Sequence, residues 1–292
     1  MKVGVHGKEF NKQSAAFIES IFDSLAANRI DIVVSSKFHK VLSKFSAFKR
    51  FRFRVYEPGD SLKNLQLFLS LGGDGTLLDS VTHISQNEVP ILGINTGRLG
   101  FLATISREET QRALDLVLER QYVVEKRTLL ELNSNHDLFE GFNFALNDFT
   151  LVKKDTSSMI TVHTYINGEF LNSYWSDGII VATPTGSTGY SLSCGGPLVF
   201  PQSGNFVITP ISPHNLTVRP IVVSDQSEIT FRVEGRSKKF LVSLDSRMAT
   251  IDDTVELVIK KAKHSVQLVQ LPDHHYFKTL RHKLNWGLDI RN

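Results

Sequence analysis

Cysteine is almost absent from the sequence, since Cys194 is the single one among 292 residues. One cysteine cannot build an internal disulfide framework, and this composition is typical of a reducing compartment. No run of 18 apolar residues occurs, and the first ten residues, MKVGVHGKEF, contain no apolar segment of signal-peptide length. These absences predict a soluble, cytoplasmic protein with no membrane partner.

An excess of charge of one sign is also missing. The 33 Lys and Arg residues nearly balance the 30 Asp and Glu residues, which leaves a net charge of +3. The densest basic stretches, FKRFRFR (48–54) and KKAKH (260–264), are short, and such stretches are more often solvated surface than nucleic-acid sites. We therefore expect no nucleic-acid partner, and the 41% hydrophobic content is that of a globular protein.

The first 120 residues alternate between strand-like and helix-like segments. Apolar residues recur at helical spacing within residues 17–25, and the segment 106–121 opens with Ser106 and Glu109 in the spacing of a capping box. Short apolar runs that end in turn residues, such as 65–71 and 89–97, separate these helices. This alternation indicates a parallel sheet with helices on its faces.

The pattern changes after about residue 123 to short β-rich runs separated by turn residues. The sequence NGEF (167–170) is typical of a hairpin turn, and closely spaced strands without helices indicate an antiparallel sandwich. We therefore predict an α/β + all-β fold. It comprises a parallel-sheet α/β domain (1–123), a β-sandwich domain (124–273) and a C-terminal tail (274–292) that packs back on the first domain.

Glycine is concentrated in one short stretch, LSLGGDGTLL (69–78), at a predicted strand-to-helix junction. Bare backbone and a helix N-terminus suit a phosphate group. The stretch has no lysine, is not a P-loop, and no G-x-G-x-x-G follows the first strand. The alternative is a strained turn that needs glycine. Asp74 favours a chemical role, because a carboxylate among phosphate-binding amides repels an anion unless it serves as general base or metal ligand.

A second polar segment, DGIIVATPTGSTGYSLSCGGP (177–197), carries seven hydroxyl residues between positions 183 and 193. Hydroxyl groups and exposed amides suit a neutral ligand such as a ribose or a base, although an irregular surface loop is the other interpretation. In ALNDF (145–149), Asn147 and Asp148 end a strand; they can recognise a base edge and a diol, or form a turn.

Taken together and in order, the segments resemble the NAD kinase family, which phosphorylates the 2′-hydroxyl of the adenosine ribose of NAD. GGDGT alone also occurs in diacylglycerol and sphingosine kinases, so segment 177–197 carries most of the resemblance. The matching segments span most of the chain: GGDGT (72–76), NTGRLGF (95–101), ALND (145–148), residues 177–197, ISPHNLTVRP (211–220) and LRHKLNWG (280–287).

The resemblance implies a role for each matching residue. Asp74 is the expected general base, and the N–H groups of Gly72, Gly73, Asp74, Gly75 and Thr76 hold the donor phosphates. Phe101 packs near the adenine, and Asp177 reaches the nicotinamide half. The remaining nucleotide-binding residues are Asn147, Asp148, Thr185, Thr188, Gly189, Tyr190, Ser191, Leu192 and Ser193.

The resemblance also implies NAD as substrate, ATP or polyphosphate as phosphoryl donor, a divalent metal ion (Mg²⁺ or Mn²⁺) and a homo-oligomer, dimer or tetramer. Two alternatives stay open: a lipid kinase that shares GGDGT, and a non-catalytic NAD(P) sensor.

Three positions depart from the common family pattern. Asp148 stands in place of a glutamate, Gly189 in place of an alanine, and Ser246 in place of the glycine of a DG step. None of these changes removes Asp74.

Overall fold

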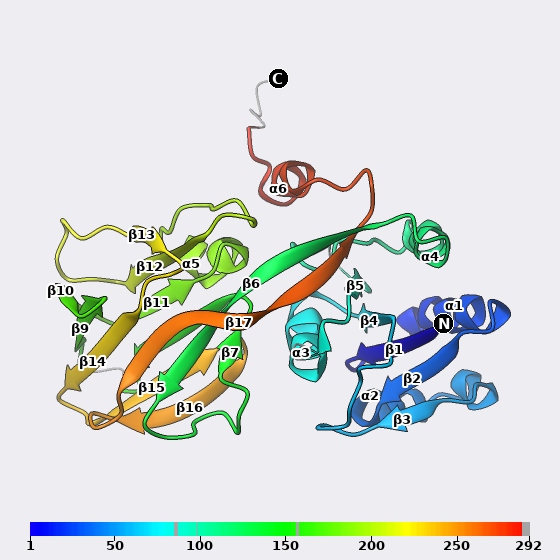
Figure 1. Ribbon diagram of the computed structural model, residues 1–292, viewed down its shortest axis with the longest axis horizontal. Helices are drawn as coiled ribbons and strands as arrows, with labels where there is room; N and C mark the ends of the chain where they lie inside the picture. Colours follow the sequence, from blue (N-terminus) through cyan, green and yellow to red (C-terminus); the bar gives the residue numbers. More distant parts are fainter. Residues whose placement is uncertain (85–86, 98, 156–157, 288–292) are drawn as a thin grey trace. The chain divides into compact units, whose positions relative to one another are not determined.

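The computed structural model describes residues 1–84, 87–97, 99–155 and 158–287 (Figure 1). The chain forms two compact units: unit 1 contains residues 1–126 and the chain from residue 266 onward, and unit 2 contains residues 127–265. Arg98 and residues 288–292, which belong to segments discussed above, lie outside the described residues.

Unit 1 follows the predicted alternation of strands and helices. Its elements are β1 (Lys2–Gly7), α1 (Lys12–Ala27), β2 (Asp31–Ser35), α2 (Ser36–Leu42), η1 (Ser46–Arg50), β3 (Arg54–Tyr56), β4 (Leu67–Leu71), α3 (Asp74–Ile84), β5 (Ile91–Ile94), α4 (Thr110–Leu118) and α6 (Tyr276–Leu284). Two further strands, β6 (Val123–Ser134) and β17 (Leu257–Gln270), contribute residues to both units.

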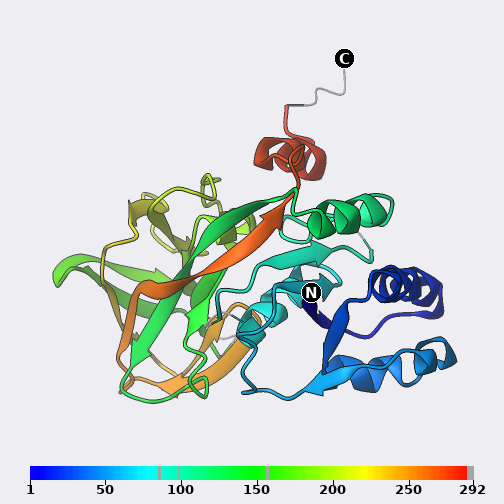
Figure 2. The same cartoon turned by 45° about the vertical axis from the view of Figure 1, so that its right-hand side comes forward.

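The sheet of unit 1 is parallel, with strand order β5-β4-β1-β2-β3. The carboxyl ends of its strands therefore lie at one edge, which is where α/β sheets bind ligands. Helix α3 packs against β1 and β4. Helix α1 is capped by Asn11, whose side chain accepts the N–H of Ser14, and it lies beside α4 (Figures 1 and 2).

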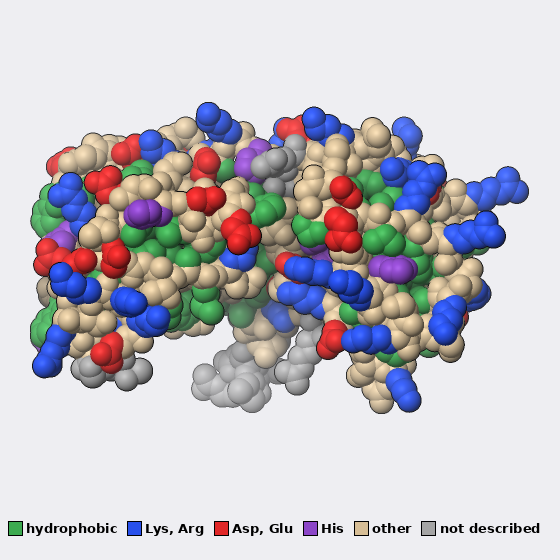
Figure 3. All heavy atoms as spheres, turned by 90° about the horizontal axis from the view of Figure 1, so that it is seen from below, with side chains coloured by type: hydrophobic (Ala, Val, Ile, Leu, Met, Phe, Trp, Pro, Cys, Tyr) green, Lys and Arg blue, Asp and Glu red, His purple; other side chains and the backbone are tan. Residues whose placement is uncertain are grey.

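The basic stretch 48–54 is a salt-bridged surface over an aromatic cluster. Phe48 is buried, while the Arg50 guanidinium lies 2.8 Å from a Glu19 carboxylate oxygen and 2.7 Å from one of Asp23. On the face shown in Figure 3, Lys and Arg side chains are interspersed among other residue types rather than joined into one patch.

Unit 2 contains strands in two antiparallel sheets. Its elements are β7 (Phe144–Ala145), β8 (Asp148–Lys153), β9 (Ile160–Ile166), β10 (Glu169–Ser176), β11 (Gly178–Ala182), η3 (Thr185–Thr188), α5 (Tyr190–Ser193), β12 (Asn205–Ile211), β13 (Ile221–Ser224), β14 (Ile229–Gly235), β15 (Lys239–Leu244) and β16 (Arg247–Asp252).

One sheet of unit 2 has the order β10-β9-β14-β17, and the other has the order β13-β12-β11-β8-β15-β16. Apolar side chains from both sheets form a single core cluster, which includes Phe149, Phe231 and Phe240. The predicted hairpin turn joins β9 to β10, with Asn167 and Gly168 at φ 53° and 83°, as a type I′ turn requires. The predicted α/β + β-sandwich fold is confirmed.

The C-terminal tail packs on unit 1, as predicted. His274 Nε2 lies 3.1 Å from a Glu109 carboxylate oxygen, and the Lys283 ammonium of α6 donates to the Leu99 carbonyl. Across the described ranges, no helix is long and apolar enough to cross a membrane.

Candidate functional site

The glycine turn lies between β4 and α3, at the carboxyl edge of the parallel sheet. A Cβ at Gly72 would collide with the side chain of Thr76, so packing alone requires this glycine. At Gly73 and Gly75, by contrast, apart from the adjacent residues and the backbone of the helix itself, no atom of the described residues lies within 4 Å of the position a Cβ would take. The turn thus combines one glycine that is needed for packing with two that leave the backbone open to a ligand.

Only part of the turn offers free donors. The Gly72 N–H donates to the Ile94 carbonyl at 3.0 Å, and the Thr76 N–H donates to the Gly73 carbonyl at 2.9 Å. Within the described chain, the N–H groups of Gly73, Asp74 and Gly75 have no such partner. Three free N–H groups at the N-terminus of an eleven-residue helix are an arrangement that suits an anion.

The Asp74 carboxylate is fixed by a distant loop. Its Oδ2 accepts the N–H of Phe101 at 2.8 Å, and its Oδ1 accepts those of Leu102 at 3.0 Å and Ala103 at 2.9 Å. Gly100 makes this approach possible, because a Cβ there would collide with the carboxylate. We call one carboxylate that accepts three consecutive N–H groups a carboxylate clamp. It uses both lone pairs of Oδ1 and leaves one on Oδ2.

A cation at the turn comes from outside the motif. Lys8, just after β1, donates its ammonium group to the Gly75 carbonyl at 3.0 Å. The motif itself contains no lysine, so sequence analysis missed this charge. Nothing in the sequence indicates the contact, since it depends on β1 lying beside β4 in the sheet.

Unit 2 contains a second carboxylate clamp. Asp245, at the turn between β15 and β16, accepts the N–H of Leu146 at 2.9 Å on Oδ2. Its Oδ1 accepts those of Asn147 at 2.8 Å and Asp148 at 3.2 Å. This clamp fixes the start of β8, which presents the two predicted ligand residues Asn147 and Asp148.

Asp148 has a strongly altered acidity. Its side chain is buried, and burial, with the nearby Asp245 carboxylate as the second cause, raises the pKa of Asp148 to about 7. Although Asp245 as a residue is partly exposed, its carboxyl group is desolvated, and this burial raises its pKa as well. Near neutral pH the pair therefore exchanges a proton with solvent.

The hydroxyl-rich segment packs against the Asn147 strand end and divides into structural and accessible groups. The Thr183 hydroxyl donates to the Leu146 carbonyl at 2.5 Å, and the Ser187 hydroxyl donates to the Pro184 carbonyl at 2.7 Å. The predicted ligand residue Ser191 is buried, and its Oγ lies 2.8 Å from the Thr209 hydroxyl. These hydroxyl groups hold the loop together.

The other predicted residues of this segment are more varied. Tyr190, the first residue of α5, is 46% exposed, and Ser193 is exposed as well. Thr188 donates to the Thr185 carbonyl at 3.2 Å, whereas Thr185 itself is buried. The partly buried residues are Thr188, Gly189 and Leu192. Tyr190 and Ser193 are thus the hydroxyl groups most open to a ligand.

Asp177, between β10 and β11, forms an ion pair with Lys153, whose Nζ lies 2.6 Å from Oδ1. Burial, followed by Cys194 and then the charges of Asp177 and Asp148, raises the pKa of Tyr190. Unit 2 brings Asn147, Asp148, Asp177 and the 185–193 segment together, and unit 1 brings the glycine turn together with Phe101.

Comparison with known proteins identifies the family. The profile of the ATP-NAD kinase N-terminal domain matches residues 3–122, and that of the ATP-NAD kinase C-terminal domain matches residues 146–271. The NAD kinase of Cytophaga hutchinsonii is 49% identical over 292 residues, and that of Flavobacterium psychrophilum is 45% identical over 294 residues; each alignment covers 100% of both chains. The chain belongs to the NAD kinase family.

Solved structures of the NAD kinase family have the same fold. Yeast NADH kinase complexed with NADH has a TM-score of 0.87 at 22% identity, covering 100% of this chain and 89% of that one. An Archaeoglobus fulgidus NAD kinase in complex with ATP has a TM-score of 0.75 at 26% identity, covering 98% and 99%. The predicted NAD kinase activity is confirmed, which sets aside the lipid kinase and the non-catalytic sensor.

Two of the three departures from the NAD kinase pattern meet in space. A Cβ at Gly189 would lie 3.7 Å from Asp148 Oδ2 and 3.2 Å from the Gly186 carbonyl oxygen. Asp148, which is shorter than glutamate, and Gly189, which lacks the methyl group of alanine, therefore both leave more space between these two residues. Ser246 occupies the tip of the turn beside Asp245, which forms its carboxylate clamp despite the change.

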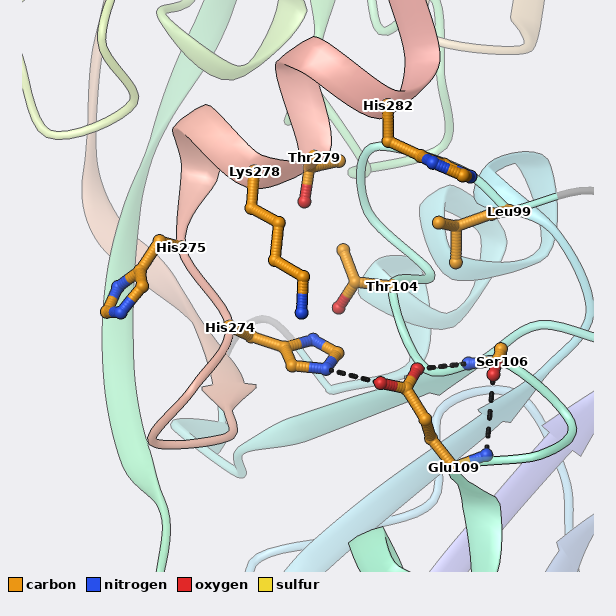
Figure 4. Close-up of a pocket in the computed structure, with 9 residues that line it drawn as sticks. All are labelled: Leu99, Thr104, Ser106, Glu109, His274, His275, Lys278, Thr279 and His282. Carbon is orange, nitrogen blue, oxygen red and sulfur yellow. Dashed lines mark hydrogen bonds and ion pairs between the residues drawn. The ribbon is translucent and has the colours of Figure 1, made fainter.

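The tail of this NAD kinase forms a pocket of about 260 Å³ with the segment that follows residue 99 (Figure 4). At its base, Ser106 and Glu109 exchange the side-chain-to-backbone hydrogen bonds of the predicted capping box at 3.3 Å, but α4 begins at Thr110, four residues later than predicted. His274 binds the same glutamate at 3.1 Å. Lys278 points into the pocket toward Thr104. The tail thus supports the segment that contains the Asp74 clamp.

Proposed function

We propose that Asp74 is the general base that takes the proton of the adenosine ribose 2′-hydroxyl of NAD as this oxygen attacks the terminal phosphoryl group of the donor. One observation carries the proposal: the carboxylate clamp fixes Asp74 and leaves a single lone pair on Oδ2. A positioned base of this kind contributes about 10²- to 10⁴-fold to a rate.

The donor phosphates bind unit 1 in this proposal. The free N–H groups of Gly73, Asp74 and Gly75 hold phosphate oxygens, while Gly72 and Thr76 form the frame of the turn. The Lys8 ammonium group adds positive charge beside Gly75. ATP is the preferred donor, since an archaeal relative was solved with ATP, and polyphosphate is the alternative. A divalent ion, Mg²⁺ or Mn²⁺, enters with the donor as part of the substrate.

NAD binds the residues that unit 2 brings together. Asn147 and Asp148 bind polar edges of the nucleotide, and Asp177 lies toward the nicotinamide half. The adenosine is lined by Thr185, Thr188, Gly189, Tyr190, Ser191, Leu192 and Ser193. The role of Phe101 near the adenine stays a prediction from the family resemblance. Ser191 acts through packing, because Thr209 already binds its hydroxyl. The yeast relative was solved with NADH, which supports a dinucleotide at these residues.

We propose three functional parts, 1–123 for the donor, 124–273 for NAD and 274–292 as supporting tail, whereas the compact units divide the chain after residues 126 and 265. We further propose a homo-oligomer, dimer or tetramer, in the cytoplasm.

The test combines turnover with binding. NADP formation is measured with NAD and a donor panel of ATP, other nucleoside triphosphates and polyphosphate, for the wild type and for Asp74→Asn. We expect kcat to fall by about 100-fold or more in the variant. NAD affinity, measured by calorimetry, stays within a few-fold of wild type. A variant kcat within tenfold of wild type would remove Asp74 from the role of base.

A further inference from the structure

Three potential metal ligands, His6, Asp79 and His83, lie together in unit 1, and none of them has a role above. One ligand atom of each residue lies within 4.8 Å of the other two. His6 is near the end of β1, and Asp79 and His83 lie four positions apart on α3, so both side chains share one face of that helix. The sheet and the helix that packs on it bring two imidazoles and a carboxylate to one point.

The three groups are close, and two of them have unused ligand atoms. His6 Nε2 lies 3.0 Å from Asp79 Oδ2, and the two imidazole rings are 4.5 Å apart between centroids. His6 is 1% exposed, while the Asp79 side chain is 28% exposed. Among the residues that the structure describes, Asp79 Oδ1 and His83 Nε2 have no hydrogen-bond partner. The cluster therefore keeps ligand atoms available beyond those of the His6–Asp79 pair.

Both imidazoles are oriented by hydroxyl groups on neighbouring strands. His6 Nδ1 lies 2.7 Å from the Ser35 hydroxyl at the end of β2, and His83 Nδ1 lies 2.9 Å from the Tyr56 hydroxyl at the end of β3. Each hydroxyl oxygen can accept an Nδ1–H. That tautomer leaves the Nε2 lone pair of His83 for a metal ion, whereas His6 Nε2 must first release the proton that it donates to Asp79. Metal-binding histidines are held in this way by a partner on the other ring nitrogen.

We propose that His6, Asp79 and His83 form a binding site for a transition-metal dication, with Zn²⁺ as the preferred occupant and water as the fourth ligand. Tetrahedral Zn²⁺ with bonds of about 2.0–2.1 Å separates its ligand atoms by about 3.3 Å. The His6–Asp79 pair is close to this spacing at 3.0 Å, and one ligand atom of His83 lies within 4.8 Å of both partners. Two imidazole ligands suit Zn²⁺ rather than Mg²⁺, so the site is distinct from the ion that accompanies the donor.

An occupied site joins β1 to α3, the helix that begins at Asp74. Lys8, two residues after His6, already contacts the first turn of α3 through the Gly75 carbonyl. A metal ion at the His6 site adds a second link between the same strand and helix. Zn²⁺ alone, without nucleotide, therefore raises the melting temperature of the full chain.

Cobalt substitution tests the site without any measurement of activity. The full-length, tag-free chain is titrated with Co²⁺, and the visible bands of four-coordinate Co²⁺ are recorded. We expect one equivalent to bind and Zn²⁺ to displace it. His83→Gln and Asp79→Asn each weaken Co²⁺ binding by more than about 100-fold, and Tyr56→Phe, which removes only a supporting hydroxyl, weakens it by about 10- to 100-fold.

His136→Gln is the matched control, because His136 is an exposed histidine of unit 2; it leaves the Co²⁺ spectrum and affinity unchanged. Circular dichroism without metal shows which variants fold. If His83→Gln or Asp79→Asn does not fold, the Co²⁺ affinity of Tyr56→Phe decides the test. The proposal is overturned if the wild type shows no four-coordinate bands, or if those bands persist with equal affinity in the folded variants. His6 and Asp79 then form only a buried ion pair.

Discussion

The two units contain the same carboxylate clamp in different surroundings. In both, Oδ2 accepts the first of three consecutive N–H groups and Oδ1 accepts the next two. Asp74 begins a helix beside open backbone at Gly73 and Gly75. Asp245 lies in a tight turn between two strands, where its carboxyl group is desolvated.

This difference shows that the clamp by itself is a structural device. It fixes the 101–103 loop in unit 1 and the start of β8 in unit 2 in the same manner. Of the two aspartates, we assign chemistry to Asp74 in the proposal above, because its clamp lies next to free N–H groups and open space. Substitutions at the Asp245 clamp should therefore affect mainly stability, and substitutions at the Asp74 clamp should affect mainly kcat.

The largest effect on stability is expected from Asp245→Asn. An asparagine amide group would face the Leu146 N–H, so one charge-assisted hydrogen bond is lost and a donor is left unpaired. Each of these losses costs about 1–3 kcal/mol, and we expect the free energy of unfolding to fall by about 2–4 kcal/mol. Urea unfolding measures it, and the KM for NAD should rise more than kcat falls. A fall in kcat that exceeds the rise in KM would contradict the assignment of the Asp245 clamp to structure and of the Asp74 clamp to chemistry.

The second prediction concerns pH and the clamp of unit 2. The pKa of Asp148 is about 7 in the folded chain, whereas its ordinary value, which applies to the unfolded chain, is 3.8. Between these values the folded chain binds more protons than the unfolded chain, so stability falls as pH rises from about 4 to 7 and then levels off. The slope is at most about 1.4 kcal/mol per pH unit.

Urea unfolding at pH 5, 6, 7 and 8 checks this slope, with Asp148→Asn as the comparison. The variant has no proton to lose and should gain stability relative to the wild type as pH rises, up to about pH 7. Parallel pH profiles for the two proteins would mean that Asp148 titrates normally.

The third prediction concerns the loop that the Asp74 clamp holds. Lys283 of α6 donates to the Leu99 carbonyl, two residues before the first N–H of the clamp. Lys283→Met should loosen the loop and lower kcat by about tenfold, since small displacements of a catalytic group are costly. Lys278→Met is the matched control, because Lys278 lies on the same helix and points into the pocket. Equal kcat values for the two variants would contradict this positioning role.

The elements whose signals are local could be predicted from the sequence. The Ser106–Glu109 capping box, the Asn167–Gly168 turn and the acid within the glycine turn each depend on residues a few positions apart. The partners of both clamps could not be predicted, because Asp74 binds N–H groups 27–29 positions away and Asp245 binds N–H groups 97–99 positions away.

The hydroxyl-rich segment shows the same limit. Its composition indicates binding, but composition does not separate Ser191, which bonds Thr209, from the exposed Ser193. That distinction arises from β11 and β12 pairing in the sheet, which only tertiary structure supplies.

The smallest effect should come from the two departures that meet beside the Asp245 clamp. Asp148→Glu adds a methylene and Gly189→Ala adds a methyl group at one place, where a new Cβ would lie 3.7 Å from Asp148 Oδ2. Each single variant should change the KM for NAD by less than about threefold. Because the groups touch, the double variant should deviate from additivity by about 0.5 kcal/mol or more. A double-mutant cycle on KM measures this coupling, and strict additivity would show that the two departures are independent changes in the NAD-binding residues.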